Sequence, residues 1–172
     1  MAGPLEHLRV IDCTDIRGAL AARILGDLGA DVVKVEAPGG DVGRMRGPFA
    51  GDAADPGRAL AFLYRNANKR GCVLDHARAS DVDAFHGLCA AADVLVDNAG
   101  PSRPPALDFA TISERHPHLV HVAIADFGLS GPRVAWRLEA LPAFAASGAL
   151  FASGFADRPP CWLPVTGVAG HR

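Results

Sequence analysis

The sequence predicts an α/β domain built on a parallel sheet, because apolar strand-like runs alternate with helical segments along the chain. The first 36 residues already contain one such unit. Residues 8–13 and 31–36 are compact apolar runs, and residues 18–28 between them place their large apolar side chains on one helical face. Gly29 stands where a helix-ending glycine belongs. Strand, short helix and strand in this order predict a βαβ unit with parallel strands.

The alternation continues after a long loop. Residues 38–57 hold six glycines and three prolines and break all periodicity, as functional loops often do. Further strands are expected at residues 59–64, 72–75, 93–96 and 119–124. Further helices are expected after an S-x-x-D cap at Ser80 and Asp83, after a cap at Asp108, and over residues 138–151. Ligand loops of such a sheet lie at the ends of its strands.

Composition excludes several classes of protein. The chain has 172 residues, of which 49% are hydrophobic, enough for a buried core, and its formal net charge of −2 lacks the basic excess of a nucleic-acid binder. Glu6 and Arg9 interrupt the N-terminal stretch where a signal peptide would be apolar, and no apolar run is long enough to cross a membrane. We therefore expect a cytoplasmic protein. The four cysteines lie far apart without a C-x-x-C pair, which favours free thiols: Cys13, Cys72, Cys89 and Cys161.

One basic segment suits an anionic ligand. Asn68, Lys69 and Arg70 place an amide and two cations in a predicted turn between two strands, an arrangement that suits a phosphate oxygen. Arg44 and Arg46 in the glycine-rich loop are expected to close on the same anion. A solvated basic turn explains the segment equally well, so both interpretations stay open.

Other candidate sites are weaker. Asp97 and Asn98 end a predicted strand, where ligand contacts are common in α/β sheets, although an Asx-turn accounts for them as well. The three histidines within residues 116–121 have a proline among them and would face different sides of a strand, which disfavours a metal site. The stretch after the first strand contains Gly18 but no G-x-G-x-x-G, which disfavours NAD binding.

Several segments, in one order along nearly the whole chain, carry a family resemblance. They read P-L-E-H-L-R-V-I-D-C-T at 4–14, L-G-D-L-G-A-D-V-V-K-V-E-A-P-G-G-D at 25–41, N-A-N-K-R-G at 66–71, A-D-V-L-V-D-N at 92–98, H-P-H-L-V-H-V-A-I at 116–124, F-G-L-S-G-P at 127–132 and S-G-F-A-D-R-P-P at 153–160. Together they resemble the class III CoA-transferases, the CaiB/BaiF family. The resemblance implies an open Rossmann-like parallel sheet over residues 1–172, in chains that normally form an interlocked dimer.

The resemblance also implies a reaction. Family members move CoA between an acyl-CoA and a free carboxylic acid, through attack of an aspartate carboxylate on the thioester and return of the CoA thiolate. No metal is implied. The positions that match CoA-binding positions of the family are Asn68, Lys69, Arg70, Leu74, His76, Asn98 and Arg103.

The chain departs from the family at its nucleophile. The aspartate position of the family falls at Ala169, and no acidic residue follows Asp157. Glu139 lies beside another acidic family position and is a weak substitute. Residues 165–172 look unlike the family, so we expect an N-terminal portion of a CoA-transferase, truncated or catalytically impaired. Two alternatives stay open: a non-catalytic CoA-binding or subunit-interaction protein that pairs with a full-length paralogue, and an enzyme like the α-methylacyl-CoA racemases, which share the fold.

Overall fold

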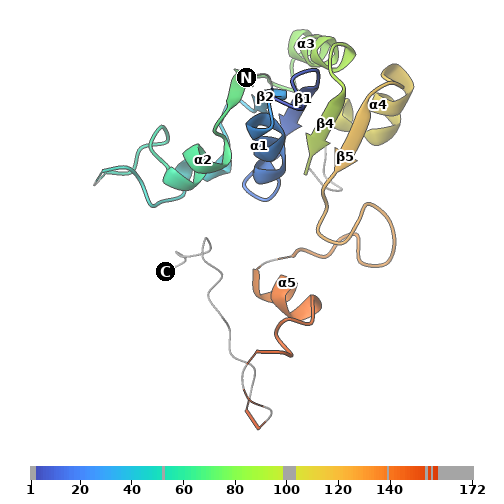
Figure 1. Cartoon of the computed structure of the whole chain (residues 1–172). Coiled ribbons are helices and arrows are strands. Elements are labelled where there is room, and N and C mark those ends of the chain that lie inside the picture. Colours follow the sequence, from blue (N-terminus) through green and yellow to red (C-terminus); the bar gives the residue numbers. More distant parts are fainter. Residues whose placement is uncertain are drawn as a thin grey trace. The chain divides into compact units, whose positions relative to one another are not determined.

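A computed structural model of the chain describes residues 3–51, 53–98, 104–138, 140–153, 155 and 157–158. The chain divides into two units, Met1–Ala125 and Asp126–Arg172. The first unit contains the sheet, and the second contains one described helix (Figure 1).

The first unit is built on a sheet of five parallel strands in the order β3-β2-β1-β4-β5 (Figure 1). The strands are β1 (Arg9–Cys13), β2 (Asp31–Glu36), β3 (Lys69–Val73), β4 (Val94–Asp97) and β5 (Val120–Ala123). The chain moves outward from β1 to β3 and then returns to the other side of β1 with β4. The strand order therefore reverses between β1 and β4, which is where open α/β sheets bind their ligands.

Helices cover both faces of this sheet. α1 (Ala19–Asp27) covers one face, and α3 (Ala79–Ala90) and α4 (Phe109–Arg115) cover the other. α2 (Leu60–Arg65) contacts α1, and short 3-10 turns lie at Val42–Met45 and Pro105–Leu107. Gly29 ends α1 at a φ of 103°, a left-handed conformation that suits glycine. The carboxylate of Asp108 accepts hydrogen bonds from the N–H groups of Ala110 and Thr111, which confirms the predicted cap of α4.

Two apolar clusters, one on each face, hold the layers together. Ala22 of α1 packs with Val10, Val32 and Val96 of the strands on one face. On the other face, Phe85 and Cys89 of α3 and Ile112 of α4 pack against Ile11, Val35 and Leu95. This alternation of neighbouring strand residues between the two clusters is what buried parallel strands require. The predicted α/β fold with a parallel sheet is confirmed.

Two predicted elements are wrong. Residues 59–64, expected as a strand, form α2 instead; the run is apolar on all sides, so periodicity does not separate strand from helix, and only Phe62 of the helix is buried. The cap predicted at Ser80 and Asp83 is not formed, because α3 begins at Ala79 and the Asp81 carboxylate accepts from the N–H of Asp75. The third strand begins at Lys69 rather than at residue 72.

The second unit contains α5 (Ala140–Ala146), shorter than the predicted helix over residues 138–151. Gly148, at a φ of 77°, follows the helix and donates to the carbonyl of Ala145. A left-handed glycine at this place is a common helix end. Before the helix, Phe127 and Trp136 form an edge-to-face aromatic contact.

Candidate functional site

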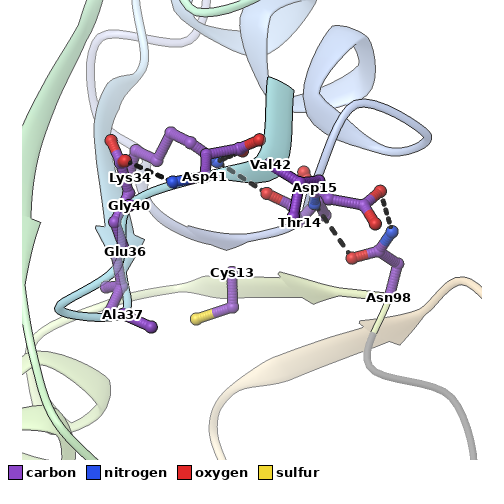
Figure 2. A pocket seen from close by; sticks show the side chains of 11 residues that line it. Cys13, Thr14, Asp15, Lys34, Glu36, Ala37, Gly40, Asp41, Val42 and Asn98 are labelled. Atoms are coloured by element: carbon purple, nitrogen blue, oxygen red, sulfur yellow. Dashed lines mark hydrogen bonds and ion pairs between the residues drawn. The ribbon is translucent and has the colours of Figure 1, made fainter. Parts of the chain in front are cut away.

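A cleft of about 210 Å³ opens at the carboxyl ends of β1, β2 and β4 (Figure 2). It lies at the reversal of strand order, where ligand loops of α/β sheets meet. Three segments contribute its polar side chains: residues 13–15 after β1, residues 34–42 from β2 into the following loop, and Asn98 after β4. Its lining residues include Cys13, Thr14, Asp15, Lys34, Glu36, Asp41 and Asn98.

Thr14 is fixed at the end of β1 through all three of its polar atoms. The Asp12 carboxylate oxygen Oδ1 accepts from Thr14 N at 2.9 Å and from Thr14 Oγ1 at 2.6 Å. The ammonium of Lys34 donates to the Thr14 carbonyl at 2.6 Å. A backbone held by side chains of β1 and β2 is preorganised, so a ligand need not order it on binding.

Asn98 joins the end of β4 to the turn after β1. Its side-chain oxygen accepts from the Asp15 N–H at 3.0 Å, and its amide nitrogen donates to the Asp15 carboxylate (Figure 2). Burial favours the neutral acid of Asp15, but hydrogen bonds from Arg17 and Asn98 outweigh it and lower the pKa of this carboxyl. Asp15 is therefore ionised near neutral pH and bridged to β4.

A layer of paired charges lies beside the cleft. It consists of the ion pairs Lys69–Asp12 at 2.6 Å, Lys34–Asp41 at 2.9 Å and Arg44–Glu36 at 2.7 Å. Three cations thus meet three carboxylates, and all these side chains except that of Arg44 are buried. The hydrogen bonds from Arg44 lower the pKa of Glu36. Because each buried charge has a partner, the layer avoids the large penalty of an isolated buried ion.

The predicted basic turn is not formed, because Lys69 and Arg70 belong to β3 and point to opposite faces. The Lys69 ammonium donates to Asp12 Oδ2, to the Ala19 carbonyl and to Asn66 Oδ1, at 2.6, 2.7 and 2.9 Å. These bonds use all three of its donors, so none is left for a phosphate. Burial outweighs the attraction of Asp12 and lowers the pKa of Lys69.

The neighbouring cations are engaged elsewhere. Arg70 is exposed, forms two hydrogen bonds with Asp31, and lines a second cavity of about 420 Å³ beside α3. Arg44 contacts Glu36 and lies over the ring of Phe62, 3.9 Å from its centroid. Arg44 and Arg70 thus pair with different carboxylates, and only Arg70 lines the second cavity.

The remaining predicted positions separate into two groups. Leu74 and His76 follow β3 at the same edge of the sheet as the cleft, and the Leu74 N–H donates to the Glu36 carbonyl at 2.9 Å. Asn68 precedes β3, at the opposite edge, and donates to Asp27 Oδ1 at 2.6 Å. Arg103, Glu139 and Ala169 lie outside the described residues.

Sequence reasoning missed the residues that build the site: Asp12, Thr14, Asp15, Lys34, Glu36 and Asp41. One signal was available. Asp12 and Lys34 are charged residues inside short apolar strands, and charges in such positions need a partner in the neighbouring strand or loop.

Several thiols and histidines also lie near the site. Cys13 is among the lining residues of the cleft and packs against the apolar cluster on the α3 face. Burial raises the pKa of its thiol well above the usual value, so it is not a thiolate at neutral pH. Cys72 and Cys89 are also free thiols. His121 contacts the Asp97 carboxylate, whereas His116 contacts His86. Within the described ranges, no group of three metal-ligating side chains is found.

No described helix has the length and apolar character that crossing a membrane requires.

Residues 5–168 match the model of CoA-transferase family III. The chain is 41% identical over 152 residues to a probable CoA-transferase of Mycobacterium tuberculosis, covering 87% of this chain and 18% of that protein. It is 33% identical over 166 residues to the subunit BbsE of succinyl-CoA:(R)-benzylsuccinate CoA-transferase from Thauera aromatica, covering 95% and 40%.

Solved structures agree with the sequence comparison. The crystal structure of a CAIB/BAIF family protein from Brucella suis superposes with a TM-score of 0.86 at 29% identity, covering 96% of this chain and 44% of that one. The chain thus spans less than half of the length of these relatives. Its parallel sheet, its sequence over residues 5–168 and its structural neighbour lead to one conclusion: the chain belongs to CoA-transferase family III.

Proposed function

We propose that this chain binds acyl-CoA as part of a class III CoA-transferase, which moves CoA between an acyl-CoA and a small carboxylic acid. The observation that carries the proposal is the cleft at the carboxyl ends of β1, β2 and β4, framed by the fixed Thr14–Asp15 backbone and by Asn98. Relatives are named as succinyl-CoA, formyl-CoA and acetyl-CoA transferases, which supports a CoA thioester as the ligand.

The size of the cleft limits how much of the ligand it holds. At about 210 Å³ it is smaller than the roughly 300–1,000 Å³ of sites that enclose a whole small molecule. We therefore place the thioester end of CoA in the cleft beside Asn98 and lay the nucleotide along the sheet edge past Leu74 and His76. Arg103 is a further proposed CoA contact, because it matches a CoA-binding position of the family. Lys69 is not proposed as a contact, because its three donors are used elsewhere, and Arg70 is not, because it lines the second cavity and not the cleft.

The carboxylates of the cleft do not supply the nucleophile in this proposal. Asp15, Glu36 and Asp41 are each held in an ion pair, so attack on a thioester would break that pair. By the resemblance, the family position of the nucleophile falls at Ala169. This substitution favours a second candidate, a CoA-binding subunit that pairs with a complete CoA-transferase; the BbsE relative is itself named as a subunit. We propose a dimer, of two copies or with such a partner, in the cytoplasm.

Calorimetric titration with CoA tests the proposal. Asn98→Ala removes two hydrogen bonds that frame the cleft, and we expect about tenfold weaker CoA binding, equivalent to about 1.4 kcal/mol. Asn68→Gly is the matched control: it removes an asparagine amide at the opposite edge of the sheet and keeps the left-handed φ of 61°, so CoA affinity should stay within about twofold. Absence of CoA binding by the unaltered chain at millimolar concentration would overturn the proposal.

Exchange of label between acyl-CoA and free carboxylic acids separates the two candidates. The catalytic candidate predicts exchange by the chain itself, whereas the subunit candidate predicts CoA binding with exchange only after a complete family member is added.

A further inference from the structure

Lys69 is a buried lysine that supports the cleft but is not one of its lining residues. The side chain of Lys69 is 1% exposed and that of its partner Asp12 is fully buried, so this ion pair lies beneath the surface. The three donors of the Lys69 ammonium connect β1, α1 and the residue after α2, through Asp12, the Ala19 carbonyl and Asn66. Lys69 is absent from the residues that line the cleft.

Asp12 connects Lys69 to the wall of the cleft. Its oxygen Oδ2 accepts from Lys69, while its oxygen Oδ1 accepts from the N–H and the hydroxyl of Thr14. The next residue, Asp15, is bridged to Asn98. The Asp12 carboxylate thus links Lys69 of β3 to the Thr14–Asp15 backbone, which forms the wall of the cleft.

We propose that Lys69 is a positioning residue for the CoA ligand: it orients the Asp12 carboxylate, and Asp12 holds the Thr14–Asp15 turn in its binding conformation. This inference rests on the proposed function of the cleft. It assigns to the lysine of the N-K-R segment a role different from the direct phosphate contact that the basic segment suggests.

Loss of the Lys69 ammonium leaves the buried Asp12 carboxylate without its cation. The other buried cation of the layer is Lys34, whose ammonium already holds the Thr14 carbonyl and Asp41. An unpaired carboxylate is strongly attracted to such a cation. Rotation of Asp12 toward Lys34 would break its bonds to Thr14, and the turn would lose its fixed conformation.

Two ligands and three variants separate positioning from direct contact. The ligands are CoA and pantetheine, which is the part of CoA that lacks phosphate. With Lys69→Met we expect binding of both ligands to weaken about tenfold and by the same factor. With the charge-neutral pair Asp12→Asn/Lys69→Met, whose asparagine still offers an oxygen to Thr14, both affinities should return to within about threefold. Arg9→Met, an exposed cation at the amino end of β1, is the control.

Direct contact predicts a different pattern. Lys69→Met would then weaken CoA binding and leave pantetheine binding unchanged, and the double variant would not restore CoA binding. Either result overturns the inference. If Lys69→Met does not fold, the double variant decides alone, since a direct contact requires it to lose CoA affinity.

Hydrogen exchange of the unliganded chain gives a readout that does not depend on CoA. Exchange at the amides of Thr14 and Asp15 should accelerate at least tenfold in Lys69→Met, or in Asp12→Ala if the former does not fold, and should return in the double variant. Unchanged exchange would overturn the inference. If the unaltered chain binds neither ligand, the proposed function fails, and these exchange rates still decide whether Lys69 holds the turn.

Discussion

Two buried histidines should make the stability of the first unit depend on pH. His86 of α3 and His116 after α4 are 5% and 7% exposed, and His86 Nδ1 lies 3.1 Å from His116 Nε2. Burial lowers the pKa of both imidazoles below 6.5, Arg115 lowers both further, His118 adds to the effect on His116, and Asp83 opposes it at His86. Only one proton fits between the two nitrogens. The folded pair therefore binds at most one extra proton, whereas the unfolded chain binds two.

The sign of the effect follows from this difference. The unfolded state binds more protons below pH 6.5, so the free energy of unfolding falls as the pH decreases through that value. The slope is at least about 1.4 kcal/mol per pH unit for one proton, and about twice that where both histidines stay neutral. Between pH 6 and pH 4.5 the pair should remove about 2 kcal/mol or more, a large share of a typical stability of about 5–15 kcal/mol.

Urea unfolding measured at intervals between pH 7.5 and pH 4.5 checks this prediction. The double variant His86→Gln/His116→Gln removes both titrating groups and should reduce the slope between pH 6 and pH 4.5 by at least about 1.4 kcal/mol per pH unit. His7→Gln, an exposed histidine, should leave the slope unchanged. A double variant that retains the slope of the unaltered chain would refute the reasoning.

Two further substitutions test the packing and the helix cap. Phe85→Ala empties a fully buried position between α3 and the sheet, and we expect a loss of about 3–5 kcal/mol in urea unfolding; a loss below about 1 kcal/mol would contradict the burial of this ring. Asp108→Ala removes the acceptor for the first N–H groups of α4 and should cost about 1 kcal/mol in the same assay. Asp108→Ser keeps an acceptor and should cost less, so equal losses in the two variants would count against a capping role.

Much of the sheet could be predicted from the sequence. β1, β2 and β4 are short apolar runs bounded by polar or turn residues, because the apolar clusters cover them on both faces. β5, at the edge of the sheet, alternates between exposed and half-buried residues. The cap of α4 at Asp108 was predictable because its bonds are local. The helix α2 was not, since its identity depends on tertiary packing: Phe62 is buried while Leu60 and Leu63 are exposed.

Only a small part of the site could be predicted from the sequence. The rule that ligands bind after parallel strands placed Asn98 correctly beside the cleft. The same reasoning misplaced Lys69, because β3 begins three residues earlier than expected and turns a supposed loop cation into a buried strand residue. Its partner Asp12 is 57 residues away, and their contact depends on the order of the strands, which sequence periodicity does not determine.

The central claim, that CoA occupies the cleft at the carboxyl ends of β1, β2 and β4, is tested most directly by backbone NMR of the chain titrated with CoA. We predict that the largest shifts fall at residues 13–15, at residues 36–42, at Leu74 and His76, and at Asn98. Shifts concentrated instead around Arg70, Leu88 and Ala92, which line the second cavity, would contradict the claim and move the ligand to the α3 face of the sheet.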